Sequence, residues 1–231
     1  MAGGLGGTVR WPGASRLGNA GETEVAVRAL IVDYGGVLIR LPSAPDNIAR
    51  VAAQVGLQPT DLLTGVFGPD RARWREARTG ALSEAELWAE AGRLWQRTPD
   101  QVDWVRRQLF DDVRIHTELV RTLWRLRPKM RLALVSNALP SFTDTWRRLG
   151  FLDLFHVALN SSLVGMAKPD RTIFHLALGS LGVGPEACIC IDDQQANLEA
   201  AAALGMRTVH FRDEDQTVTA LLGTTEAPQD R

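Results

Sequence analysis

The sequence predicts an α/β protein with a doubly wound parallel sheet and a helical segment inserted after the first strand. From residue 113 onward, β-branched apolar runs alternate with helical segments of about ten residues, a pattern typical of βαβ units. Residues 43–112 show helical periodicity almost throughout. The first apolar run, 25–33 ("VAVRALIVD"), has the composition of a strand that is buried on both faces.

The other strands and their helices follow in alternation. Strands are expected at 131–137 ("RLALVSN"), 154–161 ("LFHVALNS"), 187–193 ("ACICIDD") and 207–211 ("RTVHF"). The accompanying helices are expected at 116–127, 141–150, 171–182 and 197–205. Because parallel strands need crossover connections, these helices should cover both faces of the sheet.

The inserted segment divides into helices at Gly, Thr and Pro residues. Ser43 can cap the first helix and Gly56 can end it, and further helices are expected within 60–68, 70–80, 82–96 and 99–113. We expect four tryptophans at helical spacing to form the core of a small bundle: Trp74, Trp88, Trp95 and Trp104. A basic stretch is interpreted as a solvated helix face, with contact to a substrate anion as the alternative. It consists of Arg71, Arg73, Arg75 and Arg78.

Composition also sets the expected domain boundaries. Residues 1–25 hold seven glycines without hydrophobic periodicity and are expected to be a flexible leader. The remaining segments are the sheet core (26–42 and 113–214), the helical insertion (43–112) and a C-terminal tail (215–231).

Charge and cysteine content limit the partners and the compartment. With a formal net charge of −1, the chain has no global field to recruit nucleic acid or an anionic membrane. No apolar run approaches the roughly 18 residues of a membrane-spanning helix. Cys188 and Cys190 share one face of an expected strand, which is a poor arrangement for a disulfide, so a reducing cytoplasm is the expected compartment. We expect a monomer or a homodimer.

Carboxylates stand at two strand ends of the predicted sheet. Asp33 ends the first strand, and Asp192 and Asp193 end the fourth. Because ligands collect beyond the carboxyl ends of strands in a doubly wound sheet, we expect these side chains to share a site. Asp33, Asp193 and a backbone carbonyl near Gly35 offer the hard oxygen ligands that Mg²⁺ prefers. The sequence therefore predicts Mg²⁺ as the cofactor.

Three further residues at the same edge suit a phosphoryl group. Ser136 and Asn137 end the second strand and, with backbone N–H groups at the start of the next helix, can bind phosphate oxygens. Lys168 follows the third strand and supplies a compact positive charge. It is one of only two lysines among 26 basic residues, which suggests that an ammonium is needed there. With its charge neutralised, Asp33 can attack phosphorus and form an aspartyl-phosphate that water opens.

Four motifs, in order, make residues 27–212 resemble the haloacid dehalogenase-like hydrolase superfamily. "IVDYGGVL" (31–38) looks like the first motif and "LVSNA" (134–138) like the second, while "GMAKPDRTIF" (165–174) is similar to the third. "CIDDQQANLEAAAALGM" (190–206) closely resembles the fourth. The resemblance implies a Rossmann-like core of the phosphatase-type branch, with an α-helical cap that closes over the sheet to select substrate and exclude water.

The resemblance also implies roles for single residues. Asp33 is expected to be the nucleophile and a metal ligand, and Asp193 the second carboxylate on Mg²⁺. Asp192 is expected to support the metal from beside it, and Asn197 to orient this loop or Lys168. Ser136 and Asn137 take the same phosphate-binding role that their position predicts.

The chain departs from the family pattern at Gly35. Family phosphatases usually carry a second Asp there, which protonates the leaving group and then activates water, whereas this chain reads Asp33-Tyr34-Gly35. General acid–base catalysis is worth about 10²–10⁴-fold, so activity is expected to be reduced rather than abolished. Tyr34 points to the opposite side from Asp33, and we expect it to pack beneath the helical cap.

Three functions stay open on the sequence. The first is a phosphatase for a small phosphorylated substrate whose leaving group departs easily, such as an acyl or anomeric sugar phosphate, or receives its proton from the cap or from water. The second is a binding or regulatory protein with a weakened or inactive site. The third is a carbon–halogen hydrolase, a branch that also lacks the second Asp but has no need of the metal-type "IDDQQAN" at 191–197.

Overall fold

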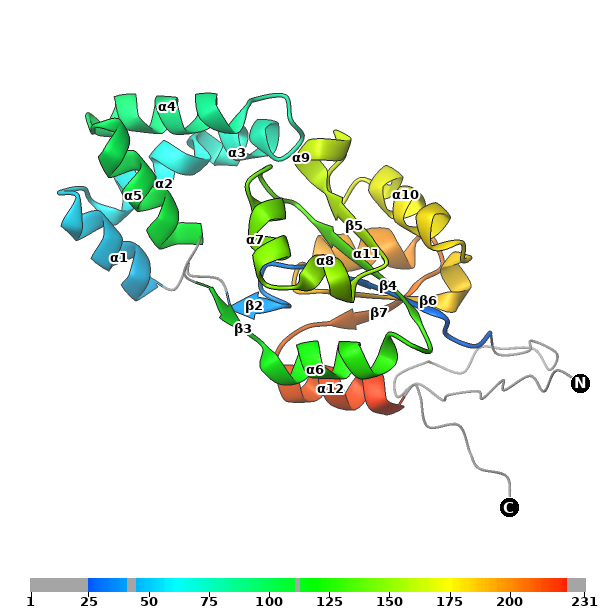
Figure 1. Ribbon diagram of the computed structural model, residues 1–231. Helices are drawn as coiled ribbons and strands as arrows, with labels where there is room; N and C mark the ends of the chain where they lie inside the picture. The colour runs from blue at the N-terminus through cyan, green and yellow to red at the C-terminus, as the bar shows by residue number, and fades with distance from the viewer. Residues whose placement is uncertain (1–24, 41–44, 111–112, 224–231) are drawn as a thin grey trace, which may run out of the picture.

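The computed structural model describes residues 25–40, 45–110 and 113–223. Except for Val25, the expected leader lies outside the described residues, as do Ser43 and the end of the expected tail, 224–231. The described chain forms a sheet core with a group of helices, the helical cap, beside it (Figure 1). None of the helices in these residues combines the length and the hydropathy that crossing a membrane requires.

A five-stranded parallel sheet forms the core, as the sequence predicts. The strands are β1 (Ala29–Val32), β4 (Arg131–Ser136), β5 (Val157–Asn160), β6 (Cys188–Asp192) and β7 (Arg207–His210). Their order is β5-β4-β1-β6-β7, so the first strand in the chain lies in the middle of the sheet (Figure 1). Residues that follow β1 are therefore neighbours of residues that follow β4 and β6.

Helices cover both faces of the sheet, and alternation along each strand decides which face a side chain joins. Leu30 and Val32 of β1 belong to one hydrophobic cluster, whereas Ala29 and Ile31 belong to the other. The first cluster is covered by α6 (Thr117–Leu126), α7 (Phe142–Arg148), α8 (Phe151–Leu154) and α12 (Glu214–Gly223). The second is covered by α9 (Ser161–Val164), α10 (Arg171–Leu181) and α11 (Gln195–Ala202). Burial on both faces explains why the strands read as continuous apolar runs.

The two cysteines lie on one face of β6, in the second hydrophobic cluster. Both Cys188 and Cys190 are buried and neither forms a disulfide. Burial raises the pKa of the Cys188 thiol to about 12, so this thiol stays protonated and acts as a small apolar side chain.

The helical cap has a hydrophobic core of its own. It consists of α1 (Pro45–Gln54), α2 (Pro59–Phe67), the 3-10 turn η1 (Pro69–Arg71), α3 (Ala72–Ala77), α4 (Glu84–Trp95) and α5 (Pro99–Phe110). Trp88 and Trp95 are buried in this core, and Trp74 and Trp104 pack against it, in agreement with the prediction. The start of α4 is fixed by a reciprocal pair of hydrogen bonds between Ser83 and Glu86, residues whose types and spacing form a capping box.

Several expected elements have different boundaries in the structure. The first strand, expected within 25–33, covers only Ala29–Val32. The strand expected at 154–161 begins only at Val157, because Gly150 adopts φ 74° and the chain then forms α8. The helix expected at 70–80 is interrupted, because Asp70 (φ 49°) and Arg71 (φ 58°) both adopt left-handed backbone angles. Neither backbone turn breaks the hydrophobic periodicity, so the pattern gave no sign of them.

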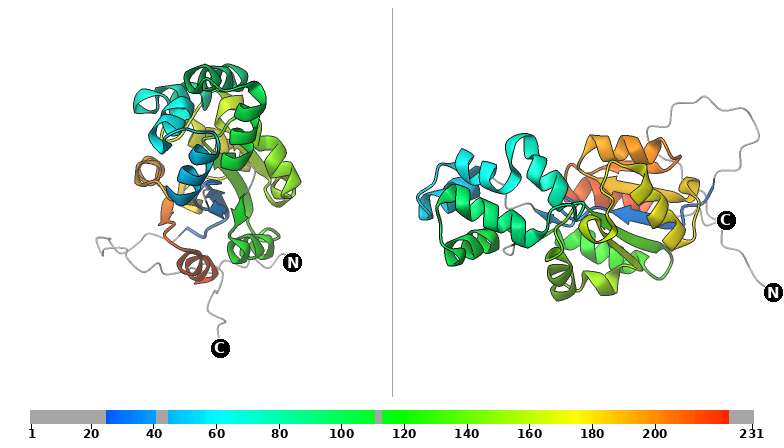
Figure 2. Two further views of the ribbon diagram at one scale, coloured as in Figure 1. Left: turned by 90° about the vertical axis from the view of Figure 1, so that its left-hand side faces the viewer. Right: turned by 90° about the horizontal axis from the view of Figure 1, so that it is seen from above.

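A short antiparallel ribbon joins the core to the helical cap. It pairs β2 (Ile39–Arg40) with β3 (Arg114–Ile115), the two chain segments that lead into and out of the cap. The Glu84 carboxylate, at the start of α4, accepts hydrogen bonds from the Ser141 backbone N–H (3.0 Å) and hydroxyl (2.7 Å). Leu139, which follows β4, is buried in the hydrophobic core of the cap. These contacts hold the cap against the core at the carboxyl end of β4. The helices of the cap lie together at one end of the core (Figure 2).

Candidate active site

Three carboxylates from two neighbouring strand ends converge at the carboxyl edge of the sheet. Asp33 directly follows β1, Asp192 is the last residue of β6, and Asp193 comes next. Because β1 and β6 pair side by side, one oxygen from each carboxylate lies within 4.8 Å of the others. The structure thus brings together the two metal ligands that the sequence predicts and the residue predicted to support them.

Lys168 lies between two of these carboxylates. Its Nζ is 2.9 Å from Asp33 Oδ1 and 2.6 Å from Asp192 Oδ2, and the side chain is only 2% exposed. Burial alone would lower the pKa of this ammonium, but the attraction of Asp33 and Asp192 outweighs burial and raises it. Lys168 is therefore held in its charged form, as a fixed positive charge beside the expected nucleophile.

Burial and, to a smaller extent, neighbouring negative charge raise the pKa values of the two predicted metal ligands. Burial raises the pKa of Asp33 to about 7 against the opposing effect of Lys168, and the charge of Asp192 adds to the rise. Burial and then the charge of Asp192 also raise the pKa of Asp193. A divalent cation between Asp33 and Asp193 would reverse this effect, because a nearby positive charge favours the ionised carboxylate.

Asp192 has both of its oxygens engaged by the protein. Oδ2 faces Lys168 Nζ, while Oδ1 accepts hydrogen bonds from the Asn197 amide (2.9 Å) and the Gln194 backbone N–H (2.9 Å). These contacts fit the supporting role predicted for Asp192. Of the two groups that Asn197 is expected to orient, its amide donates to the carboxylate of Asp192.

Asp193 is the carboxylate best prepared for a cation. Its Oδ1 is buried and has no hydrogen-bond partner in the described parts of the chain, while Oδ2 accepts only from the Gln194 amide (3.3 Å). The backbone carbonyl of Asp193 lies 3.1 Å from His210 Nε2, which fixes the loop from β7. A buried carboxylate oxygen without a partner is unfavourable, and hard oxygen donors suit Mg²⁺, so these residues fit the predicted ion.

Asn137 holds the Lys168 loop in place. Its amide oxygen accepts from the Lys168 backbone N–H (2.8 Å) and its amide nitrogen donates to the Lys168 carbonyl (2.8 Å). The sequence placed this side chain on the phosphoryl group, whereas the structure places it on the backbone of Lys168. Ser136 is buried at the end of β4, the neighbour of β1. The backbone N–H of Ala138 donates to the Ser161 hydroxyl (3.0 Å), so it is not free for a phosphate oxygen.

The loop after β1 leaves the Gly35 carbonyl unused by the protein. The loop closes through hydrogen bonds to the carbonyls of Tyr34 and Ile39, and none of those found among the described residues uses the carbonyl of Gly35. In the described residues no hydrogen bond therefore competes with the predicted role of this carbonyl as a metal ligand. Tyr34 differs from its prediction, because its ring packs against aromatic rings of the core helices α7 and α8 rather than beneath the cap. These rings are Phe142, Trp146 and Phe151.

Gly36 is a site residue that the sequence reasoning missed. It has φ +88°, and a Cβ placed there would lie 2.5 Å from Asp193 Oδ2. The residue therefore has to lack a side chain for the β1 loop to close over Asp193. The sequence shows this residue as the second glycine of "IVDYGGVL", but it does not show that the glycine packs against Asp193, far along the chain.

We expect Gly36→Ala to weaken Mg²⁺ binding at least about tenfold, because the added methyl displaces the carboxylate of Asp193, a predicted metal ligand, and the backbone angle is strained. The measurement is Mg²⁺ titration by calorimetry. Gly150→Ala is the matched control: Gly150 also has positive φ (74°), but a Cβ there meets nothing within 4 Å. Equal Mg²⁺ affinity in the two variants would contradict the expected contact.

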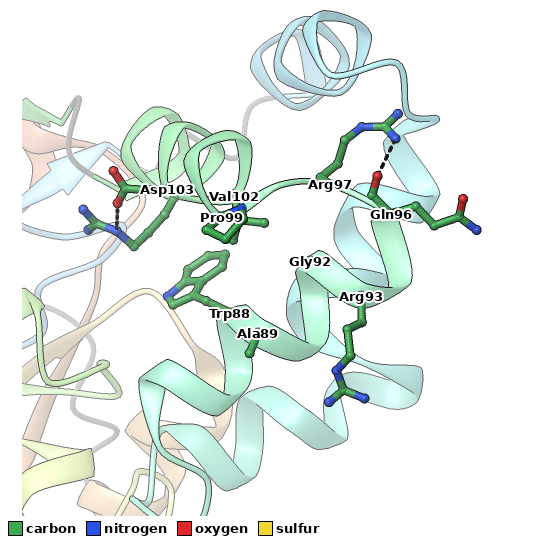
Figure 3. Close-up of a pocket in the computed structure, with 10 residues that line it drawn as sticks. Trp88, Ala89, Gly92, Arg93, Gln96, Arg97, Pro99, Val102 and Asp103 are labelled. Carbon is green, nitrogen blue, oxygen red and sulfur yellow. Dashed lines mark hydrogen bonds and ion pairs between the residues drawn. The ribbon is translucent and has the colours of Figure 1, made fainter.

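A separate cavity lies within the helical cap. It has a volume of about 640 Å³ and opens between α4 and α5, with the Trp88 indole and Gly92 on one side and Pro99 and Val102 on the other (Figure 3). None of the residues that line it belongs to the carboxylate site. The cavity is therefore a feature of the cap rather than part of the candidate active site.

Comparison with known proteins identifies the family of this chain. Residues 27–205 match the haloacid dehalogenase-like hydrolase family. The chain therefore belongs to the haloacid dehalogenase-like hydrolases.

Curated relatives match this chain over part of their own length. The chain is 28% identical over 209 residues to acyl-CoA dehydrogenase family member 10 of Mus musculus, which covers 85% of this chain and 19% of that protein. It is 33% identical over 85 residues to phosphoserine phosphatase of Thermus thermophilus, and the aligned region covers 36% of this chain and 34% of the phosphatase. The chain thus spans well under half the length of both relatives.

Solved structures resemble the chain over most of its length. A predicted haloacid dehalogenase-like hydrolase from Porphyromonas gingivalis is 26% identical with a TM-score of 0.69, covering 86% of this chain and 98% of that one. A family enzyme from Bacteroides thetaiotaomicron, solved as the wild-type protein with magnesium and inorganic phosphate, is 24% identical with a TM-score of 0.64. The second match covers 81% of this chain and 95% of that one, and it establishes likeness of fold.

Proposed function

We propose that this chain is a Mg²⁺-dependent phosphatase that hydrolyses a small phosphorylated metabolite through an aspartyl-phosphate on Asp33. The observation that carries the proposal is the convergence of Asp33, Asp193 and Lys168 at one edge of the sheet. Two negative ligands for a cation and one fixed ammonium are the charges that a phosphoryl group needs beside a carboxylate nucleophile. Family relatives that are named phosphatases support the same reaction class.

The residues divide the work between them. Asp33, Asp193 and the Gly35 carbonyl would hold Mg²⁺, which when bound supplies positive charge to the phosphoryl oxygens. Lys168 holds Asp33 through Oδ1 and adds a second positive charge. The Asp33 carboxylate then attacks phosphorus as the bond to the leaving oxygen breaks. Water attacks the aspartyl-phosphate, releasing inorganic phosphate and restoring Asp33.

The leaving group needs a proton that residue 35 does not supply. Glycine has no side chain to donate it, so substrates that leave without protonation, such as acyl or anomeric sugar phosphates, fit this site best. An alkyl phosphate would depend on a proton from water or from the helical cap. The proposed substrate is therefore a small phosphorylated metabolite with a good leaving group.

We expect Gly35→Asp to raise kcat for an alkyl phosphate by about 10²-fold, because it restores a general acid. The gain for acetyl phosphate should be much smaller, since its leaving group needs no proton. Gly35 is not among the glycines with positive φ, so its backbone angle does not disfavour a side chain. Steady-state kinetics with glycerol 3-phosphate and acetyl phosphate measure the two gains. If kcat rises equally for the two substrates, or for neither, the lack of a general acid at residue 35 does not limit the activity.

The same glycine favours a second candidate function. A site that binds Mg²⁺ and phosphate but lacks a general acid could serve a binding or regulatory protein with little turnover. The two candidates share all of the ligand contacts and differ only in chemistry, so the rate of phosphate release separates them.

The deciding experiment is phosphate release from acetyl phosphate and p-nitrophenyl phosphate, with Mg²⁺ or with a chelator. The proposed phosphatase releases phosphate only with Mg²⁺, and Asp33→Asn does not. If wild type and Asp33→Asn are equally inert across a broad panel of phosphate esters, the binding function is correct. Chloride release from a short haloacid without added metal would instead identify a carbon–halogen hydrolase.

A further inference from the structure

Three arginines of the helical cap form a cluster of positive charge without carboxylate partners. Arg71, Arg75 and Arg78 lie on and just after η1 and α3, and in the described parts of the chain none of them forms an ion pair. Two have other contacts: the Arg71 guanidinium lies over the Phe67 ring, 4.9 Å from its centroid, and Arg75 donates to the Asp70 carbonyl. Arg78 is the one whose side chain makes no such contact among the described residues.

Arg78 is also the least solvated member of the cluster. Its side chain is partly buried, and its Nε is buried without a hydrogen-bond partner in the described structure. Burial, followed by repulsion from Arg75 and Arg71, lowers the pKa of Arg78 from its ordinary value. An arginine keeps its charge under these conditions, so the protein holds a partly desolvated cation that is repelled by its neighbours. Such an arrangement is unfavourable until an anion binds.

The position of Arg78 connects it to the candidate active site. Two residues later, a Cβ at Gly80 would lie 2.6 Å from the Ser162 carbonyl, so this part of the cap touches α9 of the core (Figure 1). Next to Ser162, the Ser161 hydroxyl accepts from the Ala138 N–H, and the adjacent Asn137 holds the Lys168 loop. The turn two residues after Arg78 therefore meets the core next to the loops that carry the expected phosphoryl site.

We propose that Arg78 binds a second anionic group of the substrate while the phosphoryl group is at Asp33. The planar guanidinium donates paired hydrogen bonds that match a carboxylate or a phosphate. Arg73 is not a candidate for this role, because its guanidinium donates to the Gly65 carbonyl at 2.7 Å. The inference rests on the proposed function and narrows the substrate class to small organophosphates that carry a second negative group.

The test compares two unreactive phosphonates, methylphosphonate and phosphonoacetate, which differ by one carboxylate. Calorimetry with Mg²⁺ is run on the wild type, Arg78→Ala and Arg78→Lys. We expect the wild type to bind phosphonoacetate at least about tenfold more tightly, Arg78→Ala to lose this preference and Arg78→Lys to keep part of it. Arg93→Ala is the control, because Arg93 is a cap arginine that is 74% exposed and already pairs with Glu90, and it should keep the full preference.

No preference in the wild type, or the same preference in Arg78→Ala, would overturn the inference. Equal weakening of both phosphonates in Arg78→Ala would mean that the residue acts on the structure of the cap, and it would overturn the inference as well. Phosphate release from acetyl phosphate by the wild type is measured on the same protein preparation. If binding of phosphonoacetate depends on Arg78 but no phosphate is released, the phosphatase is refuted and the anion site stands. If phosphate is released but the wild type does not prefer phosphonoacetate, the anion site is refuted and the phosphatase stands.

Discussion

Replacing Asp33 by Asn is expected to lower the rate of phosphate release by at least about 10³-fold, because the amide removes the nucleophile. The loss should appear in kcat and persist at saturating substrate and Mg²⁺. Asp33→Asn should nevertheless fold, since Lys168 keeps its shorter contact, 2.6 Å to Asp192 Oδ2. The measurement is steady-state kinetics with acetyl phosphate, together with thermal unfolding of the metal-free protein.

The matched control is Asp144→Asn. Asp144 forms an ion pair with Arg147 on the surface of α7, and its side chain is 80% exposed. This variant also removes one carboxylate charge, and it should keep the wild-type rate. If Asp33→Asn retained more than about a tenth of the wild-type rate, the nucleophile would have to be another residue.

Replacing Lys168 by Met is expected to reduce the free energy of unfolding by about 3–5 kcal/mol in the presence of a chelator, because it leaves buried carboxylates without their counter-charge. The Asp33 and Asp192 side chains are 10% and 1% exposed, so water does little to replace the ammonium. The measurement is urea denaturation at neutral pH, with the midpoint and slope fitted for each variant.

The chain offers a matched control in its only other lysine. Lys129 is exposed, so Lys129→Met should change stability by less than about 0.5 kcal/mol. Adding Asp192→Asn to Lys168→Met should recover part of the loss, because it removes one of the unpaired charges. If the two lysine variants were equally stable, the buried charge network would not be holding the site together.

The sheet and the convergence of the site could be predicted because both depend on local patterns and on a general property of parallel sheets. Continuous apolar runs identify strands that are buried on both faces, and helices between them make the sheet parallel. The carboxyl ends of such strands share one edge, which is enough to bring Asp33 and Asp193 together without knowledge of any contact. Because lysine is rare in this chain, the sequence indicates a need for an ammonium at Lys168, and its ion pairs with Asp33 and Asp192 account for that need.

The contacts that shape the site could not be predicted, because they join residues distant in the sequence through single hydrogen bonds or through close packing. The position of Asn137 predicts contact with the phosphoryl group, but its amide bonds to the backbone of Lys168, 31 residues away. The packing of Gly36 on Asp193 and the bonds of Glu84 to Ser141 are of the same kind. The two-residue strands β2 and β3 are also too short for any periodic pattern.

The most direct test is a high-resolution structure of the protein with Mg²⁺ and inorganic phosphate. The proposed site predicts one octahedral ion with oxygen ligands at about 2.1 Å, among them a carboxylate oxygen of Asp33 and one of Asp193, with the phosphate next to Lys168. An ion bound elsewhere, or a phosphate that does not approach the Asp33 carboxylate, would contradict the site from which the function is inferred.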